Sequence, residues 1–245
     1  MKSGTKYILQ KLLGFKNYLF VFSLFKIYTL KQDKNEKDFF CFLSLIPENT
    51  AVLDIGANIG IMTVHLARSI KNVNIYCFEP MPTNIATLKR IINYFKLNNV
   101  QLFECALGNS EGKVEMIMPI VNSVRMQGLS HVVNNGIVEN NEGERFVVPL
   151  KILDKMDIWK ADSQRISAIK MDVENFEYFV LDGAKKLIEN NQPIVYAELW
   201  ENENREKCFS LFRNFNYKTF VVFKNKIVPF DHTHHKTQNF IFLPA

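Results

Sequence analysis

The sequence predicts a doubly wound α/β fold, in which a mostly parallel sheet is covered by helices on both faces. Short apolar runs such as AVLDI and VNIYCFE alternate with longer segments of helical character. Two of the ten glycines, Gly56 and Gly60, lie only four residues apart, directly after the first of these runs. At 245 residues the chain can bury one substantial core. Together these observations favour one main α/β domain.

The predicted elements follow one another from residue 39 to the C-terminus. In order, the first half reads as helix 39–46, strand 51–55, helix 59–70, strand 73–79, helix 83–98 and strand 100–107. From 108 to 149 glycines and polar residues interrupt short apolar segments, which indicates a hairpin-like excursion with a mobile loop. Alternation then resumes as strand 166–173, helix 175–190, strand 193–200 and helix 205–215. The last segments, 217–230 and 237–245, read as an antiparallel pair that closes the sheet edge.

The N-terminal part differs in character from this domain. It is rich in Leu and Phe, but the uncharged run between Lys16 and Lys26 is far shorter than the roughly 20 residues of a spanning helix. A small-residue cleavage site of a secretory signal is also missing. We therefore expect an amphipathic helical extension over 1–38 and the main domain over 39–245. Two roles stay open for this helix, packing on the domain or a partner subunit and peripheral membrane contact through residues 1–30.

Charge and cysteine content restrict the function classes. The net charge of +5 is spread along the chain without a basic tract, which argues against nucleic acid as a partner. The four cysteines form no C-x-x-C pair and are expected to be packed thiols, so we expect a cytoplasmic location, at the inner membrane surface if the N-terminal helix attaches there. His131 is expected to be a solvated loop residue, and the histidines of DHTHHKTQ lack the spacing of a zinc site.

Three successive strand ends carry residues suited to a nucleoside ligand. Gly56 and Gly60 lie where a strand passes into a helix, and backbone without a Cβ there can approach a ligand closely. A turn glycine and a helix-packing glycine without a ligand remain the simpler alternative. Asp54 ends the same strand, and Glu79 ends the next one about 20 residues later, where α/β folds hold a ribose diol. Small Cys105 and Ala106 follow the third strand and leave space for adenine.

At this point the sequence resembles a known family. The segments LDIGANIG, CFEPMPTN, ALGNSEG, IKMDVEN, PIVYAELWE and TQNFIF, in this order, are similar to the FkbM family of S-adenosylmethionine-dependent methyltransferases from about Asn49 onward. The resemblance implies the class I methyltransferase (Rossmann-like) sheet of seven strands, mostly parallel with an antiparallel C-terminal strand. It also implies methylation of an oxygen, usually in a sugar or a polyketide-type product. By matching positions, the cofactor site would consist of Asp54, Gly56, Ala57, Asn58, Gly60, Glu79, Pro80, Cys105 and Ala106.

Carboxylates at later strand ends are the candidates for catalysis. Asp172, Glu174 and Glu198 could bind a substrate hydroxyl, accept its proton or hold Mg²⁺, and the sequence leaves the need for a metal open. Glu174 could instead cap the following helix. Where the family has D-x-E-G, this chain has Asn175 in place of glycine, and Asn tolerates the left-handed backbone that such a turn needs.

We therefore expect an O-methyltransferase acting on a sugar hydroxyl of a glycan or glycolipid precursor. Methylation of RNA or protein in the same fold, and a nonenzymatic nucleotide-binding scaffold, are the alternatives. A homo-oligomer is left open.

Overall fold

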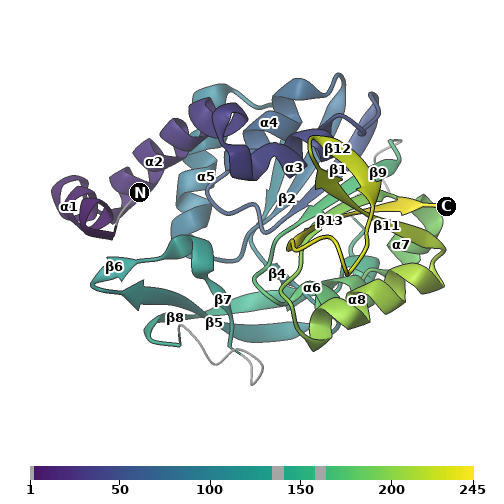
Figure 1. Ribbon diagram of the computed structural model, residues 1–245. Coiled ribbons are helices and arrows are strands. Elements are labelled where there is room, and N and C mark those ends of the chain that lie inside the picture. Colours follow the sequence, from purple (N-terminus) through teal and green to yellow (C-terminus); the bar gives the residue numbers. More distant parts are fainter. Residues whose placement is uncertain (1–2, 134–140, 158–163) are drawn as a thin grey trace.

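The computed structural model describes residues 3–133, 141–157 and 164–245, which build a central sheet with helices on both faces and a smaller second sheet below it (Figure 1). The central sheet has the strand order β12-β11-β13-β10-β9-β1-β2-β3. Its strands are β1 (Thr50–Ile55), β2 (Val73–Phe78), β3 (Val100–Phe103), β9 (Ile166–Met171), β10 (Ile194–Glu198), β11 (Tyr217–Phe223), β12 (Lys226–Pro229) and β13 (Asn239–Pro244). Neighbours from β3 to β10 are parallel, whereas β13 runs antiparallel to both β10 and β11. The predicted sheet is confirmed, and β12 adds an eighth strand at its edge.

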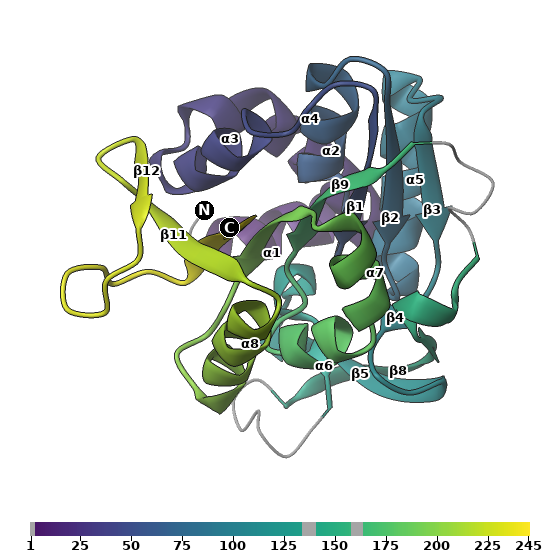
Figure 2. The ribbon, with the colours of Figure 1, turned by 90° about the vertical axis from the view of Figure 1, so that its right-hand side faces the viewer.

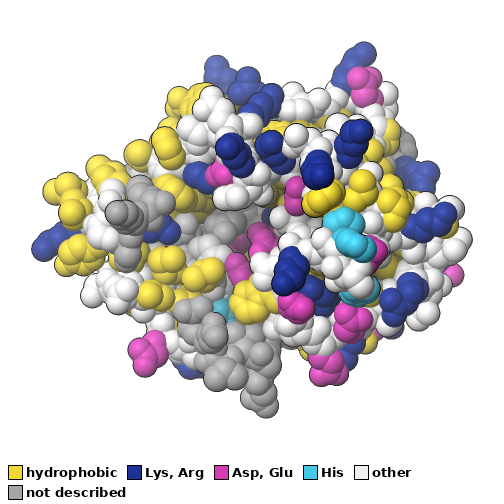
Figure 3. Space-filling view, in the orientation of Figure 1, with side chains coloured by type: hydrophobic (Ala, Val, Ile, Leu, Met, Phe, Trp, Pro, Cys, Tyr) yellow, Lys and Arg dark blue, Asp and Glu magenta, His cyan; other side chains and the backbone are white. Residues whose placement is uncertain are grey.

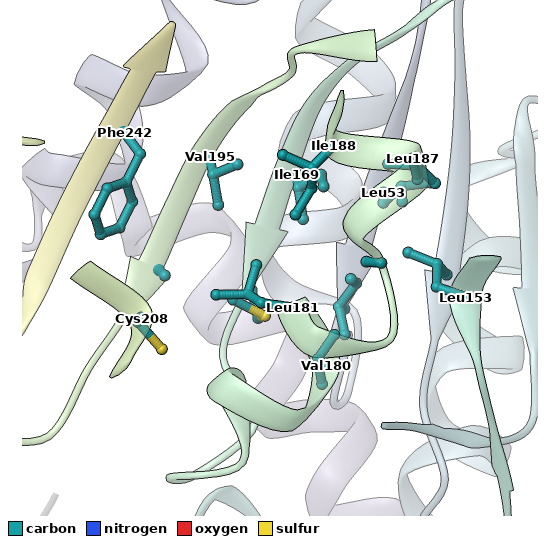
Figure 4. Packing of buried hydrophobic residues seen from close by; sticks show 14 of the residues in the cluster. Leu53, Leu153, Ile169, Val180, Leu181, Leu187, Ile188, Val195, Cys208 and Phe242 are labelled. Carbon is teal, nitrogen blue, oxygen red and sulfur yellow. The ribbon is translucent and has the colours of Figure 1, made fainter. Parts of the chain in front are cut away.

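Each face of the sheet buries its own set of strand residues, because successive side chains point to opposite faces. One face packs on α6 (Glu177–Asp182), α7 (Lys185–Asn191) and α8 (Glu203–Asn214). There Leu53 and Ile169 contact the helix residues Leu181 and Leu187 (Figure 4). The other face packs on α3 (Lys37–Leu43), α4 (Ile61–Ser69) and α5 (Pro82–Phe95). Figure 2 shows α6–α8 and α3–α4 on opposite sides of the sheet.

The helix predicted over 175–190 is two short helices, α6 and α7, which are separated at Gly183. A Cβ on Gly183 would overlap the carbonyl oxygen of Gly108, so the two backbones touch at the break. Close packing against the start of the second sheet explains why one continuous helix does not form.

The N-terminal extension also differs from the single predicted helix. It forms α1 (Ser3–Leu13) and α2 (Phe15–Thr29), followed by the 3-10 turns η1 (Leu30–Gln32) and η2 (Lys34–Glu36). Gly14, with a φ of 69°, breaks the helix between α1 and α2. Helix α2 buries Tyr18, Leu19 and Ile27 against the domain, as the packing interpretation requires. Within the described residues, no helix is long and apolar enough to cross a membrane.

A second sheet covers one end of the central sheet and contains the predicted excursion. It consists of β4 (Ala106–Leu107), β5 (Gly112–Val121), β6 (Val124–Arg125), β7 (His131–Val132) and β8 (Gly143–Lys151), with η3 (Gln127–Leu129) before β7 and η4 (Leu153–Lys155) after β8. Strands β5 and β8 form a long antiparallel hairpin. The run 100–107, predicted as one strand, is divided because β4 leaves the central sheet and pairs with β8. Residues 134–140 of the predicted loop lie outside the described part.

Candidate active site

A cavity with about 580 Å³ of empty space lies at the carboxyl ends of β1, β2 and β9, between the central sheet and the second sheet. We call it the first cavity. Eight of the candidate residues line it, namely Gly56, Asn58, Glu79, Pro80, Cys105, Ala106, Asp172 and Glu174. Their shared position follows from the topology, because parallel strands bring their carboxyl ends to one edge of the sheet. Residues of the excursion, including Ser130 and Val132, form the opposite wall.

A second cavity, with about 630 Å³ of empty space, adjoins the first across the turn after β1. Both cavities share Gly56, Asn58 and Asp172, and the second adds Ala57 and Lys170. Phe22 and Lys26 of α2 and Glu36 of η2 complete its wall. The N-terminal extension therefore forms part of the wall of the site.

Glu79 faces the first cavity with a carboxylate that is already oriented by the backbone. Its Oε2 accepts a hydrogen bond from the Asn58 amide at 2.8 Å, and its Oε1 accepts one from the Met81 amide at 2.8 Å. The side chain of Asn84 donates to Oε1 at 3.3 Å. Burial raises the pKa of Glu79 to about 7 despite these donors. The carboxylate is thus held in place at the position expected of a ribose acceptor.

The two glycines of the turn serve protein packing. Both have positive φ, 73° at Gly56 and 83° at Gly60. A Cβ on Gly56 would overlap the carbonyl oxygen of Asp172, so this glycine lets the turn after β1 touch the end of β9. A Cβ on Gly60 would come within 2.6 Å of Leu88 in α5. Gly60 does not line either cavity, and for this residue the simpler interpretation of a helix-packing glycine holds.

Asp54 was also expected beside the ligand, but the structure places it below the cavities. It is fully buried and lines neither of them. Its Oδ2 accepts a hydrogen bond from the Thr63 hydroxyl at 2.6 Å, and its Oδ1 lies 3.3 Å from Nζ of Lys170. Lys170 also donates to the carbonyl oxygen of Gly56 at 2.8 Å. The carboxylate therefore positions a buried lysine, which in turn holds the glycine turn.

Lys170 is a site residue that the sequence interpretation missed. Burial alone would lower its pKa, but the carboxylates of Asp54 and Asp172 outweigh burial and raise it. A lysine inside the apolar run ISAIKM was the available signal, because a buried charge requires a partner.

The three candidate catalytic carboxylates lie close enough to affect one another. Asp172 lines both cavities, Glu174 lines the first, and Glu198 is half-buried at the end of the neighbouring strand. Burial and then the charge of Asp172 raise the pKa of Glu174 to about 9 and that of Glu198 to about 7. Figure 3 shows acidic side chains at the bottom of a hollow in the middle of this face. In the part of the chain that the structure describes, no group of three or more His, Cys, Asp or Glu is arranged to hold a metal ion.

In the turn after β9, Asn175 has the left-handed backbone conformation that the sequence interpretation allowed for it. Asn175 adopts a φ of 72° and is buried. Its Oδ1 accepts hydrogen bonds from the side chains of Asn202 at 2.8 Å and Asn204 at 3.2 Å. The cap position of α6 is Phe176, without a side-chain cap, so Glu174 does not have the capping role considered for it.

His131 does not behave as a solvated loop residue. It is buried on β7 and lies outside both cavity walls, with Nδ1 at 2.9 Å from the Leu129 carbonyl oxygen. That expectation was wrong because the β5–β7 pairing turns this side chain inward. Of the late histidines, His232 and His234 are exposed and His235 is half-buried, and His234 pairs with Asp231 at 2.9 Å.

Comparison with known proteins decides the family of this fold and site. The family described as methyltransferase FkbM domain matches residues 54–229. The chain belongs to this family.

Two relatives of this FkbM-family chain carry methyltransferase names. The chain is 25% identical over 150 residues to Methyltransferase 1 of Beauveria bassiana, covering 56% of this chain and 59% of the relative. It is 27% identical over 185 residues to Methyltransferase sdnD of Sordaria araneosa, covering 64% and 68%. It also resembles the crystal structure of methyltransferase FkbM from Methylobacillus flagellatus KT, with a TM-score of 0.53 and 14% identity over 82% of this chain and 45% of that one. This last likeness supports the class I methyltransferase fold. The chain spans little more than half of the first of these relatives and less than half of the last.

Members of the FkbM family use S-adenosylmethionine, and the first cavity fits its adenosine part. Three buried polar atoms in the cavity wall, Oδ1 of Asn58, Oδ1 of Asn84 and Oγ of Ser130, lack a hydrogen-bond partner among the described residues. Buried polar atoms are rarely left unpaired, so such a set suits the polar edges of an adenine and a ribose. Glu79 would hold the ribose hydroxyls, and Cys105 and Ala106 would flank the ring. Ser130 could not be predicted from sequence, because only the fold of the excursion brings it opposite the strand ends.

Proposed function

We propose that this FkbM-family protein transfers the methyl group of S-adenosylmethionine to a hydroxyl oxygen of a sugar, in a glycan or glycolipid precursor. The observation that carries the proposal is the cluster of three carboxylates in which Asp172 and Glu174 line the cavities and Glu198 ends the neighbouring strand, although it lines neither cavity. A sugar hydroxyl is a weak acid, so it needs a base when it attacks a methyl group.

The raised pKa values of Glu174 and Glu198 give these two side chains different tasks. When bound, S-adenosylmethionine supplies a methyl group already activated by the positive charge on sulfur. Glu198, with a pKa of about 7, is partly ionised at neutral pH and accepts the hydroxyl proton. Glu174, with a pKa of about 9, stays protonated and donates a hydrogen bond to a neighbouring hydroxyl. Asp172, at the junction of the cavities, orients the acceptor between them.

The proposal is tested by incubating the protein with a donor carrying a ¹³C-labelled methyl group and the glycan and glycolipid fraction of a cell extract. The NMR shift of the product methyl group distinguishes attachment to oxygen from attachment to nitrogen. We expect an O-methyl signal that falls about 10²-fold or more in Glu198→Gln, with unchanged binding of S-adenosylhomocysteine. Glu201→Gln, which removes an exposed carboxylate three residues away, is the matched control and keeps full activity.

Other outcomes point to the alternatives. Label in the RNA or protein fraction, or on nitrogen, contradicts the sugar hydroxyl as acceptor. Normal cofactor binding without transfer to any fraction favours the nonenzymatic scaffold. A parallel incubation with a chelator reports whether the reaction needs a metal ion.

A further inference from the structure

Helices α1 and α2 carry an unusual concentration of exposed apolar side chains. Seven of the twelve large hydrophobic residues that are exposed in the described part of the chain lie on these two helices, namely Tyr7, Ile8, Leu12, Leu13, Val21, Phe25 and Tyr28. Leu12 and Phe25 are 75% and 60% exposed. Figure 3 shows hydrophobic side chains gathered over this end of the molecule. We call this surface the N-terminal face.

The exposed apolar residues of α2 form one stripe. On α2, Val21, Phe25 and Tyr28 follow one another at spacings of four and three, on the side away from buried Leu19, Ser23 and Ile27. Tyr94 of α5, which is 54% exposed, extends the apolar surface beside Phe20, with ring centroids 5.9 Å apart. An apolar surface of this kind marks a contact with a partner or a membrane.

The charges on the N-terminal face have one sign. Residues 1–32 contain no Asp or Glu, whereas Lys6, Lys11, Lys16 and Lys31 lie in the same segment as the exposed apolar residues. The guanidinium of Arg90 lies 4.1 Å from the centroid of the Phe20 ring and adds a further positive charge. The lysine of α2 that does pair, Lys26, uses Asp33 at 2.8 Å and lies in the wall of the second cavity.

We propose that the N-terminal face docks on an anionic lipid surface. Apolar side chains beside lysines, without acidic residues, are the pattern of helices that lie in the membrane interface, where anionic headgroups attract each lysine. A second copy of the chain fits less well, because self-association through this face would bring lysines together without acidic partners. The lipid contact is independent of the methyl-transfer proposal.

The N-terminal face is held in a fixed position on the domain. The side chain of Gln10 donates to the Arg125 carbonyl oxygen at 3.1 Å and accepts from the Arg125 amide at 3.2 Å, which ties α1 to β6. Buried Ser23 donates to the Ile59 carbonyl oxygen at 2.8 Å and ties α2 to the turn after β1. Phe22 and Lys26 of the same helix line the second cavity. Docking would therefore bring the lipid headgroups within about one helix diameter, 10–12 Å, of that cavity.

Sedimentation of the full chain with vesicles tests this proposal. We expect binding to vesicles of phosphatidylglycerol and phosphatidylcholine in equal parts, and much weaker binding to phosphatidylcholine alone. The double variant Leu12→Glu/Phe25→Glu should lose at least about tenfold in affinity, and Lys11→Gln and Lys16→Gln about fivefold each. Val147→Glu, at a 68% exposed valine on β8, is the matched control and binds as the wild type does.

Three results would overturn the proposal. The first is that the wild type does not bind the mixed vesicles. The second is that the double variant binds them as tightly as the wild type, and the third is that the wild type binds both vesicle compositions with equal affinity. Light scattering provides an independent check, since a stable dimer that Leu12→Glu dissociates would show that a second copy covers this face. Thermal unfolding and binding of S-adenosylhomocysteine confirm that the variants are folded.

Discussion

Replacing Lys170 by Met should be strongly destabilising, because it leaves the carboxylate of Asp54 buried without a charge partner. Asp54 is fully buried, and its Oδ1 forms an ion pair with the ammonium of Lys170, 3.3 Å away. Methionine retains most of the apolar volume of the lysine stem, so the substitution tests the charge itself. Removing one partner of a buried pair costs about 3–5 kcal/mol, a large fraction of the 5–15 kcal/mol that stabilises a typical domain.

Urea unfolding at neutral pH measures this loss, and a double-mutant cycle assigns it. Asn in place of Asp54 still accepts the hydrogen bond of Thr63 but carries no charge, so Asp54→Asn/Lys170→Met should recover much of the stability that Lys170→Met loses. Lys185→Met, which breaks the exposed pair with Asp182, is the matched control and should cost at most about 1 kcal/mol.

The reasoning is refuted if Lys170→Met loses no more unfolding free energy than Lys185→Met does. It is also refuted if Asp54→Asn/Lys170→Met is no more stable than Lys170→Met alone. The pH dependence gives a second readout. The charge of Lys170 lowers the pKa values of Glu79, Glu174 and Glu198, so its loss should move the pH profile of activity to higher pH.

Three further predictions concern Glu79 in the wall of the first cavity and two residues of the segment after β9. Glu79→Gln should weaken S-adenosylhomocysteine binding about tenfold or more. It should also abolish the gain in affinity that the wild type shows as pH rises through about 7, which calorimetry across that range would measure. An unchanged pH profile of binding would exclude Glu79 as the ribose acceptor. Burial raises the pKa of Glu177 from 4.5 to about 8, so its contribution to stability is present below pH 4.5 and is lost as pH rises to about 8. Glu177→Gln should therefore raise the melting temperature relative to wild type above that pH and have little effect in acid, and a constant difference would contradict the assignment. Asn175→Gly should lower the free energy of unfolding in urea by about 1–3 kcal/mol through lost hydrogen bonds. Asn175→Ala should lower it by about 1–2 kcal/mol more, because alanine must adopt a positive φ. Equal losses of unfolding free energy in the two variants would argue against backbone strain.

The central sheet was predictable because each of its elements has a local signal. The strands of the parallel part are short apolar runs bounded by turn residues, and the covering helices have their own apolar periodicity. The two failures within this region, the helix broken at Gly183 and the strand divided before Ala106, occur where the chain meets the second sheet. Contacts between segments far apart in sequence decided both, and such contacts leave no local pattern.

The candidate cofactor residues that share the first cavity were predictable to the extent that they lie at strand ends. Glu79, Pro80, Cys105 and Ala106 follow β2 and β3, and the topology brings them to one cavity. Asp54 ends a strand as well, but its side chain points below the cavity, toward Lys170 and Thr63. Position along a strand thus identifies the edge on which a residue lies, while the alternation of side chains sends Asp54 to the face covered by α4, where Thr63 lies.

The glycine turn shows how one residue can serve both the fold and the site. Gly56 lacks a Cβ because the carbonyl oxygen of Asp172 occupies that space, and this contact joins the ends of β1 and β9. Its own carbonyl oxygen accepts a hydrogen bond from Lys170, whose other partner is Asp54. The position of Asp172 between the two cavities therefore depends on the buried ion pair of Lys170 and Asp54, although Asp54 lines neither cavity. A variant at Asp54 should accordingly impair methyl transfer by displacing Asp172, even though its carboxylate lies outside the cavity wall.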